Sequence, residues 1–147
     1  MSIDRLPLFG GTPLAARIER AEADLITQGT EAALRRSGGA DGFAVAFGGG
    51  VASYAQDGSP LNKVAGLGFA GVPSASEFDE IERAFAAVKA PVQVELSHLS
   101  DPAIAALLTE RDYRLVSFEN VLGRALDGEL ERVEPTGVEV RLSGPDE

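Results

Sequence analysis

The stretch from Val64 to Leu96 constrains the fold most, because it contains a β-like run, a loop, an amphipathic helix and a second β-like run. An apolar stripe at helical spacing runs along the helix predicted over residues 76–89: Phe78, Ile81, Phe85 and Val88. Ser74, followed three residues later by Glu77, predicts a capping box at the start of this helix. An alternation of strands and helices is typical of α/β domains.

Elements on either side of this unit are also predicted from periodicity and turn residues. A helix is expected over residues 13–36, in two pieces interrupted at 28–30, with Thr12 as its cap and Pro13 at its first position. Three short strands should follow, the first two forming a hairpin through Gly48-Gly49-Gly50. The predicted strands are Phe43–Phe47, Val51–Ala55, Val64–Phe69 and, after the second helix, Val92–Leu96.

The last third of the chain is predicted to hold a helix and further strands. A short helix is expected over Pro102–Arg111, with a strand-like run from Tyr113 to Leu126 that bends near Glu119-Asn120. Residues 127–137 have the composition of a linker, and Val138–Leu142 alternates like a new strand.

Composition excludes several classes of protein. The chain has 147 residues, enough for one ordinary domain, and no cysteine, so the fold depends on apolar packing without disulfides. A net charge of −10 repels phosphate backbones, and we expect no nucleic-acid partner. The sequence has neither a secretory signal in residues 1–11 nor 18 consecutive apolar residues, so we expect a cytoplasmic protein with no membrane partner.

One segment resembles a known family. In Val-Glu-Leu-Ser-His-Leu-Ser-Asp-Pro-Ala-Ile-Ala-Ala-Leu-Leu-Thr-Glu-Arg-Asp-Tyr, a strand is followed by a pattern similar to the Asn-x-x-Ala-x-x-Leu-Tyr-x-x-x-Gly-Phe of the GNAT N-acetyltransferases. Asp101 falls at the Asn of that pattern, Leu107 at the Leu and Tyr113 at the final aromatic. With the order of elements, the resemblance covers roughly Thr12 to Leu126. It implies an α/β fold: a GNAT-like twisted mixed β-sheet flanked by helices on both faces, with Val64–Phe69 parallel to Val92–Leu96.

The departures from the family pattern concern the cofactor and the chemistry. Leu108 replaces the Tyr that often protonates the departing thiolate, and Asp112 replaces the Gly before the aromatic. The family holds the pyrophosphate of acetyl-CoA with a Gln/Arg-x-x-Gly-x-Gly/Ala loop, but the loop here, residues 70–76, has no Arg or Gln and contains Pro73. Gly71, Ser74, Ala75 and Ser76 are the only weak candidates for cofactor binding, and no catalytic residue is assigned.

The resemblance therefore predicts the N-terminal, cofactor-poor half of a tandem GNAT protein. Residues 1–126 would form the degenerate domain, and 127–147 a linker and the start of a second repeat. The parent would be an acetyl-CoA-dependent N-acetyltransferase, and this half would have a structural or substrate-binding role without binding acetyl-CoA itself. Its partner would be the C-terminal half or a second copy, with a small-molecule or peptide amine as substrate. The alternative is a self-sufficient acyl-CoA N-acyltransferase with an atypical pyrophosphate loop.

Three other features have structural interpretations that we prefer. Gly66-Leu67-Gly68-Phe69-Ala70-Gly71 matches Gly-x-Gly-x-x-Gly, but its first two glycines fall inside a predicted strand, where they favour a bulge or a close backbone approach over a dinucleotide site. His98 is the sole histidine, and we expect an exposed loop residue with no metal role. Glu95 is either a buried acid facing a cleft or, as is more common for such a residue, one that pairs with a neighbouring Arg or reaches solvent.

Overall fold

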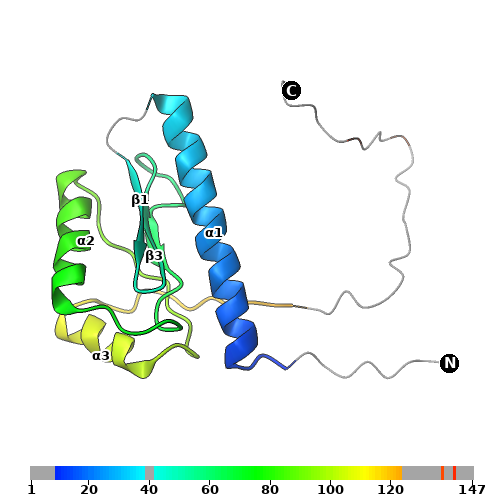
Figure 1. Ribbon diagram of the computed structural model, residues 1–147, viewed down its shortest axis with the longest axis vertical. Helices are drawn as coiled ribbons and strands as arrows, with labels where there is room; N and C mark the ends of the chain where they lie inside the picture. Colours follow the sequence, from blue (N-terminus) through cyan, green and yellow to red (C-terminus); the bar gives the residue numbers. More distant parts are fainter. Residues whose placement is uncertain (1–8, 39–41, 124–136, 138–140, 142–147) are drawn as a thin grey trace. The chain divides into compact units, whose positions relative to one another are not determined.

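A computed structural model of the chain describes residues 9–38, 42–123, 137 and 141. The chain divides into a compact unit of residues 9–118 and a second group made of residues 1–8 and 119–147. All helices and strands of the described residues belong to the first unit (Figure 1). In chain order these are α1 (Thr12–Ser37), β1 (Phe43–Phe47), β2 (Gly50–Tyr54), β3 (Lys63–Ala65), α2 (Ala75–Ala87) and α3 (Pro102–Glu110).

Helix α1 is a single continuous helix, so the predicted interruption at residues 28–30 is wrong. Gly29 lies within it, and a β-carbon there would be only 3.0 Å from Leu61 Cδ1, so the glycine gives this side chain room to pack. Thr30 is fully buried and makes a hydroxyl–hydroxyl hydrogen bond of 2.7 Å with Ser53 of β2. The predicted Thr12 cap is also wrong, because Gly11 occupies the N-cap and Thr12 already belongs to the helix.

The sheet is antiparallel, with strand order β1-β2-β3. The predicted glycine hairpin is confirmed: Gly48 and Gly49 adopt φ values of +56° and +84°, and Phe47 pairs with Gly50. Strand β3 is shorter than predicted because Gly66, at φ +82°, turns the chain out of the extended conformation.

The predicted strand Val92–Leu96 is reduced to one parallel bridge between Val94 and Val64 of β3. Two backbone hydrogen bonds form it: Val64 N–H donates to Gln93 O at 2.7 Å, and Glu95 N–H donates to Val64 O at 2.9 Å. Its parallel direction agrees with the direction that the resemblance implied.

Helices cover both faces of the sheet, as predicted (Figure 1). Against α1 the sheet buries a small cluster: Ala23, Ile26, Val51 and Ala65. The opposite face contributes to a larger core with α2 and α3: Phe47, Ala52, Val64, Leu67, Phe78, Ile81, Phe85 and Ile104. These two sets alternate along β2 and β3, as the side-chain period of two requires. The described fold is therefore a small α/β arrangement with helices on each side of a three-stranded sheet.

The strand predicted over Tyr113–Leu126 is wrong where it is described, because residues 113–123 form no regular secondary structure. Among the described residues, no ladder hydrogen bond reaches residues 113–123, and their large apolar side chains are exposed: Leu115, Val116, Phe118, Val121 and Leu122. Apolar alternation alone therefore did not specify a strand. The strand predicted over Val138–Leu142 lies outside the described residues apart from Arg141, as does the linker apart from Gly137.

The residue that follows the C-cap of α3 has a positive φ angle. Asp112 occupies the left-handed region at φ +61°, directly after the C-cap Arg111, and Tyr113 N–H donates to Leu108 O at 3.0 Å. Glycine adopts this conformation without the steric cost that a β-carbon brings. The backbone at residue 112 is thus of the kind that suits the Gly of the family pattern.

We expect the Asp112→Gly variant to be more stable than the parent. Removing the β-carbon at φ +61° should raise the free energy of unfolding by about 0.5–1 kcal/mol, measured by urea denaturation. Asp112→Ala is the control, because it removes the carboxylate and keeps the β-carbon, and it should not be stabilised. Equal gains in both variants would contradict a backbone origin.

Candidate functional site

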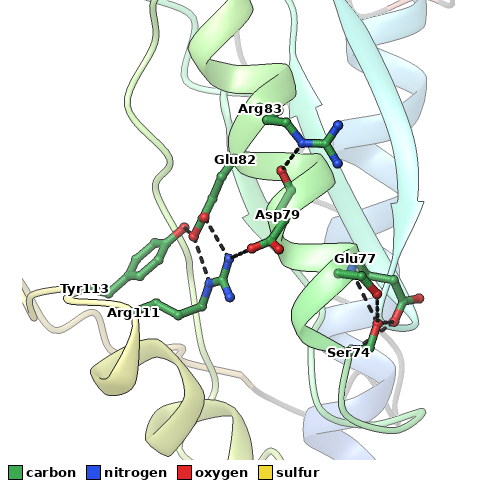
Figure 2. Close-up of polar contacts among 8 residues, drawn as sticks. Ser74, Glu77, Asp79, Glu82, Arg83, Arg111 and Tyr113 are labelled. Atoms are coloured by element: carbon green, nitrogen blue, oxygen red, sulfur yellow. Dashed lines mark hydrogen bonds and ion pairs between the residues drawn. The ribbon is translucent and has the colours of Figure 1, made fainter.

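The N-terminus of α2 is the place where the sequence left cofactor binding open. Ser74 is the N-cap, and its hydroxyl accepts a hydrogen bond from Glu77 N–H at 3.3 Å. The Glu77 carboxylate in turn accepts from Ser74 N–H and from the Ser74 hydroxyl, both at 2.7 Å. The predicted capping box is confirmed, and Figure 2 shows it at the lower end of α2. These bonds to Ser74 lower the pKa of Glu77, so its carboxylate stays charged at neutral pH.

The other weak candidates lie beside this cap. In the described part of the chain, the N–H groups of Ala75 and Ser76 donate no hydrogen bond to protein, and the Ser76 hydroxyl lies 3.1 Å from that of Ser74. Gly71 is exposed at φ +119°, with open space where a β-carbon would be. The helix dipole favours an anion at this end, but the Glu77 carboxylate already occupies part of that field.

The glycines of the Gly-x-Gly-x-x-Gly match serve close packing. Both Gly66 and Gly68 lie after β3, not inside it as predicted, with φ values of +82° and +81°. A β-carbon at Gly66 would be 3.0 Å from Gly50 Cα, and one at Gly68 would be 3.0 Å from Asp101 N. The expected close backbone approach is therefore confirmed. In a dinucleotide fingerprint a helix begins within the glycine loop. Here α2 begins only at Ala75, after Pro73 and the cap residue Ser74.

A second polar cluster joins α2 to the end of α3. We call Arg111, Asp79, Glu82 and Tyr113 the Arg111 clamp (Figure 2). The Arg111 guanidinium donates to both Glu82 oxygens, at 3.0 and 2.8 Å, and also pairs with Asp79. Its carbon Cζ lies 5.4 Å from the centre of the Phe78 ring, within the range of a cation–π contact. The Tyr113 hydroxyl donates to Glu82 at 3.2 Å.

Each charged group of the Arg111 clamp has a partner of opposite charge, with two carboxylates sharing the one guanidinium. The hydrogen bonds from Arg111 hold the pKa of Glu82 below its usual value. Burial, with the nearby Glu82 charge, raises the pKa of Tyr113 to about 12. A tyrosine with so high a pKa is a poor proton donor near neutral pH, and the guanidinium is already paired. The cluster therefore acts as a structural link between helices, with no free group for catalysis among its members.

The Tyr113 pKa gives a pH dependence that can be measured. Between the ordinary tyrosine value, about 10, and about 12, the folded chain keeps a proton that the unfolded chain loses. The free energy of unfolding should therefore fall as pH rises through this window. Below the window Tyr113 is protonated in both states and causes no pH dependence. Phenolate absorbance should show the high transition, and the Tyr113→Phe variant should lack it. A Tyr113 transition at the ordinary value would contradict the buried contact with Glu82.

Sequence analysis left the role of Glu95 open, and the structure places it in an ion pair. Its carboxylate lies 2.5 Å from the Lys63 ammonium of β3, which is also 3.9 Å from Glu22 of α1. Nearby, the pKa of Glu19 is raised, because the effect of burial outweighs the opposite effect of a hydrogen bond from the Gly66 backbone. These residues tie α1 to the edge of the sheet. They make the ion-pair interpretation of Glu95 the correct one.

The remaining candidates are dispersed. His98 is exposed in a turn, as predicted, and no group of metal-ligating side chains occurs among the described residues. The Asp101 side chain caps α3 by accepting from Ala103 N–H at 2.9 Å. Leu108 packs against the larger core. Ser53 is committed to its buried bond with Thr30, so it is not available as a nucleophile.

Sequence reasoning did not find the Arg111 clamp. Asp79 and Glu82 are three residues apart and so lie at neighbouring positions on one face of the predicted helix. This spacing indicates an acidic pair that could bind a basic side chain. Their partner, however, lies 29 residues beyond Glu82, and nothing local indicates that α3 ends beside α2.

Comparisons with known protein families, curated proteins and solved structures found no match. Within the described residues, no helix has the length and apolar character needed to cross a bilayer.

Proposed function

We propose that this chain is a GNAT-like domain without a binding site for acetyl-CoA, and that it has a structural or substrate-binding role in an acetyl-CoA-dependent N-acetyltransferase. The observation that carries the proposal is the capping box at the N-terminus of α2, which places the Glu77 carboxylate there. Ser74 N–H and Glu77 N–H are both bonded to capping side chains, and the Glu77 carboxylate lies where a diphosphate would need positive potential. The loop before it supplies no basic side chain and loses one donor at Pro73.

Two further observations favour the family side of the proposal. The order of elements, with a parallel bridge between β3 and Val94 on either side of α2, agrees with the order that the resemblance implies. The left-handed backbone at Asp112 suits the glycine of the family pattern, so the departure there changes the side chain and keeps the conformation. Neither observation depends on the cofactor loop.

The catalytic partner in this proposal is another GNAT domain, either a C-terminal half or a second copy. That partner would bind acetyl-CoA and transfer its acyl group to an amine on a small molecule or peptide. This chain would supply packing surface or one wall of the amine site. The net charge of −10 suits a cationic amine better than an anionic cofactor.

A self-sufficient acyl-CoA N-acyltransferase is the second candidate. It is favoured by the two N–H groups at Ala75 and Ser76, which donate to no other described group and lie at the positive end of the α2 dipole. An anion placed there would have two donors and no basic side chain. Such a site would bind a pyrophosphate more weakly than the loop of the family does.

Titration calorimetry of the chain with acetyl-CoA separates the two candidates. We expect no heat of binding at millimolar cofactor, for the parent and for Glu77→Gln, because removing one charge does not supply the missing donors. Micromolar binding by the parent would favour the self-sufficient enzyme. Binding that appears only in Glu77→Gln would contradict our view of the loop, since the carboxylate alone would then be the obstacle.

A further inference from the structure

The connection between β2 and β3 contains an exposed tight turn. Ser59 N–H donates to Gln56 O at 3.1 Å, which closes a four-residue turn with Asp57 and Gly58 at its centre. Gly58 has φ +71°, and apart from its two chain neighbours no described residue lies within 4 Å of the position that a β-carbon would take. Both central residues are exposed. Solvent therefore reaches the Asp57–Gly58 peptide bond, and the Asp57 side chain is itself exposed beside it.

Asn62 fixes the two ends of this connection and leaves its centre free. Its carbonyl oxygen accepts from Ala55 N–H at 2.8 Å, and its amide donates to Gln56 O at 2.7 Å. Among the described residues, Gly58 N–H makes no hydrogen bond. The nitrogen that follows the Asp57 carboxyl is thus both sterically open and without a protein partner.

We propose that Asp57–Gly58 is a site of spontaneous isoaspartate formation. The Gly58 nitrogen attacks Cγ of Asp57, forms an N–C bond, loses its proton and expels the carboxyl oxygen as water, which closes a five-membered succinimide. One water then opens the ring. When water adds at the Asp57 main-chain carbonyl carbon, the bond from that carbon to the Gly58 nitrogen breaks and the nitrogen regains a proton, so the chain continues through the side-chain carbonyl and the main-chain carbonyl becomes a free carboxylate. One water leaves and one enters, so the mass is unchanged and no oxidant or reductant takes part.

The product changes the turn in a way that the contacts define. An isoaspartyl linkage adds one methylene to the backbone between Gln56 and Gly58 and moves the free carboxylate onto the α-carbon. The Ser59 N–H to Gln56 O bond depends on the normal four-residue spacing and is lost. The bonds of Asn62 to Ala55 and Gln56 then hold strand ends whose connection is too long. Ageing at this site should therefore loosen the junction of β2 and β3.

The chain has two other Asp-Gly pairs, at 41–42 and 127–128. At Gly42 the space around the backbone is filled: a β-carbon there would overlap Leu34 Cδ2 and lie 2.7 Å from Tyr54 O. Gly58 is open by the same measure. Of the two described glycines, Gly58 is therefore the more open, whereas Asp41 and the pair at 127–128 lie outside the described residues.

The test is to incubate the folded full-length chain at neutral pH and 37 °C and to label isoaspartate with a protein isoaspartyl methyltransferase. Chymotryptic mapping separates the pairs, because Phe43, Phe47 and Tyr54 lie between residues 41 and 57. We expect label to accumulate in the peptide that contains Asp57, and amide exchange at Ser59 to accelerate in the aged protein. The Asp57→Glu variant keeps the charge, cannot form the five-membered ring, and should lose this label.

Two results would overturn the proposal. One is a folded sample without label at Asp57 although a urea-unfolded sample of the same age carries it, because the turn would then protect the bond. The other is label that persists at this peptide in Asp57→Glu.

Discussion

Gly50→Ala is expected to destabilise the domain strongly. A β-carbon at residue 50 would overlap the Ala65 carbonyl oxygen and lie 2.7 Å from the Gly66 carbonyl carbon. These obstacles are backbone atoms of β3 and of the turn after it, so no side-chain rotation relieves the clash. The β2–β3 ladder would have to separate where Val51 pairs with Ala65. We expect the free energy of unfolding to fall by about 3 kcal/mol or more, a large share of the 5–15 kcal/mol typical of domains.

Two glycine controls separate steric overlap from backbone strain in that measurement. Gly10 has open space and no positive φ, so Gly10→Ala should change the free energy of unfolding by less than about 0.5 kcal/mol. Gly58 has open space but φ +71°, so Gly58→Ala should cost about 1 kcal/mol through strain alone. Urea denaturation of the three variants should rank Gly50 well above Gly58, and Gly58 above Gly10. A Gly50 variant no less stable than Gly58→Ala would show that β3 can move aside.

Elements that the sequence predicted correctly depend on interactions between near neighbours. The capping box needs only Ser74 and Glu77, which are three residues apart. The apolar stripe of α2 needs only helical spacing, and the hairpin needs only glycines able to adopt positive φ. Such features are determined before distant parts of the chain meet, so they can be recognised in one sequence.

Features that the sequence did not predict depend on distant contacts. Gly29 lies inside α1 where Leu61, which is 32 residues away in the numbering, approaches the helix closely, and this packing cannot be read from the residues around Gly29. The run after Tyr113 alternates as a strand would, yet a strand exists only where a neighbouring strand receives its hydrogen bonds. Gly66 was assigned to a strand because a positive φ cannot be seen in the sequence. In each case the missing information was the identity of a neighbour.

The same division applies to the candidate site. The chemistry of residues 70–76 could be judged from composition, since a loop without Arg, Lys or Gln has no cation to offer a diphosphate. The use of the Glu77 carboxylate on Ser74 could be expected from spacing. The Arg111 clamp could not be predicted, because the sequence is equally compatible with an exposed Arg111 that binds anions. Its pairing with Glu82 and Asp79 removes a basic group that a phosphate would otherwise attract.

The second large effect is expected from Phe78→Ala. Phe78 is 1% exposed, packs edge-on against Phe47 with ring centres 4.9 Å apart, and carries the Arg111 guanidinium over its face. Truncation should therefore cost about 3–5 kcal/mol, the range for buried aromatic residues replaced by alanine, and should also leave Arg111 without its apolar support. Thermal and urea denaturation measure this loss.

Phe118→Ala is the matched control, because Phe118 is 87% exposed, and its loss should stay within about 0.5 kcal/mol. A cost for Phe118 close to that for Phe78 would mean that the exposed apolar residues after Tyr113 are covered in solution, by another part of the chain or by a second copy. A small cost for Phe78 would mean that the core between β1 and α2 can refill the space of a ring. Helix α2 positions both the capping box and the Arg111 clamp. Comparing the losses in free energy of unfolding for Phe78→Ala and Phe118→Ala therefore tests whether close packing of the core under α2 holds the candidate site in place.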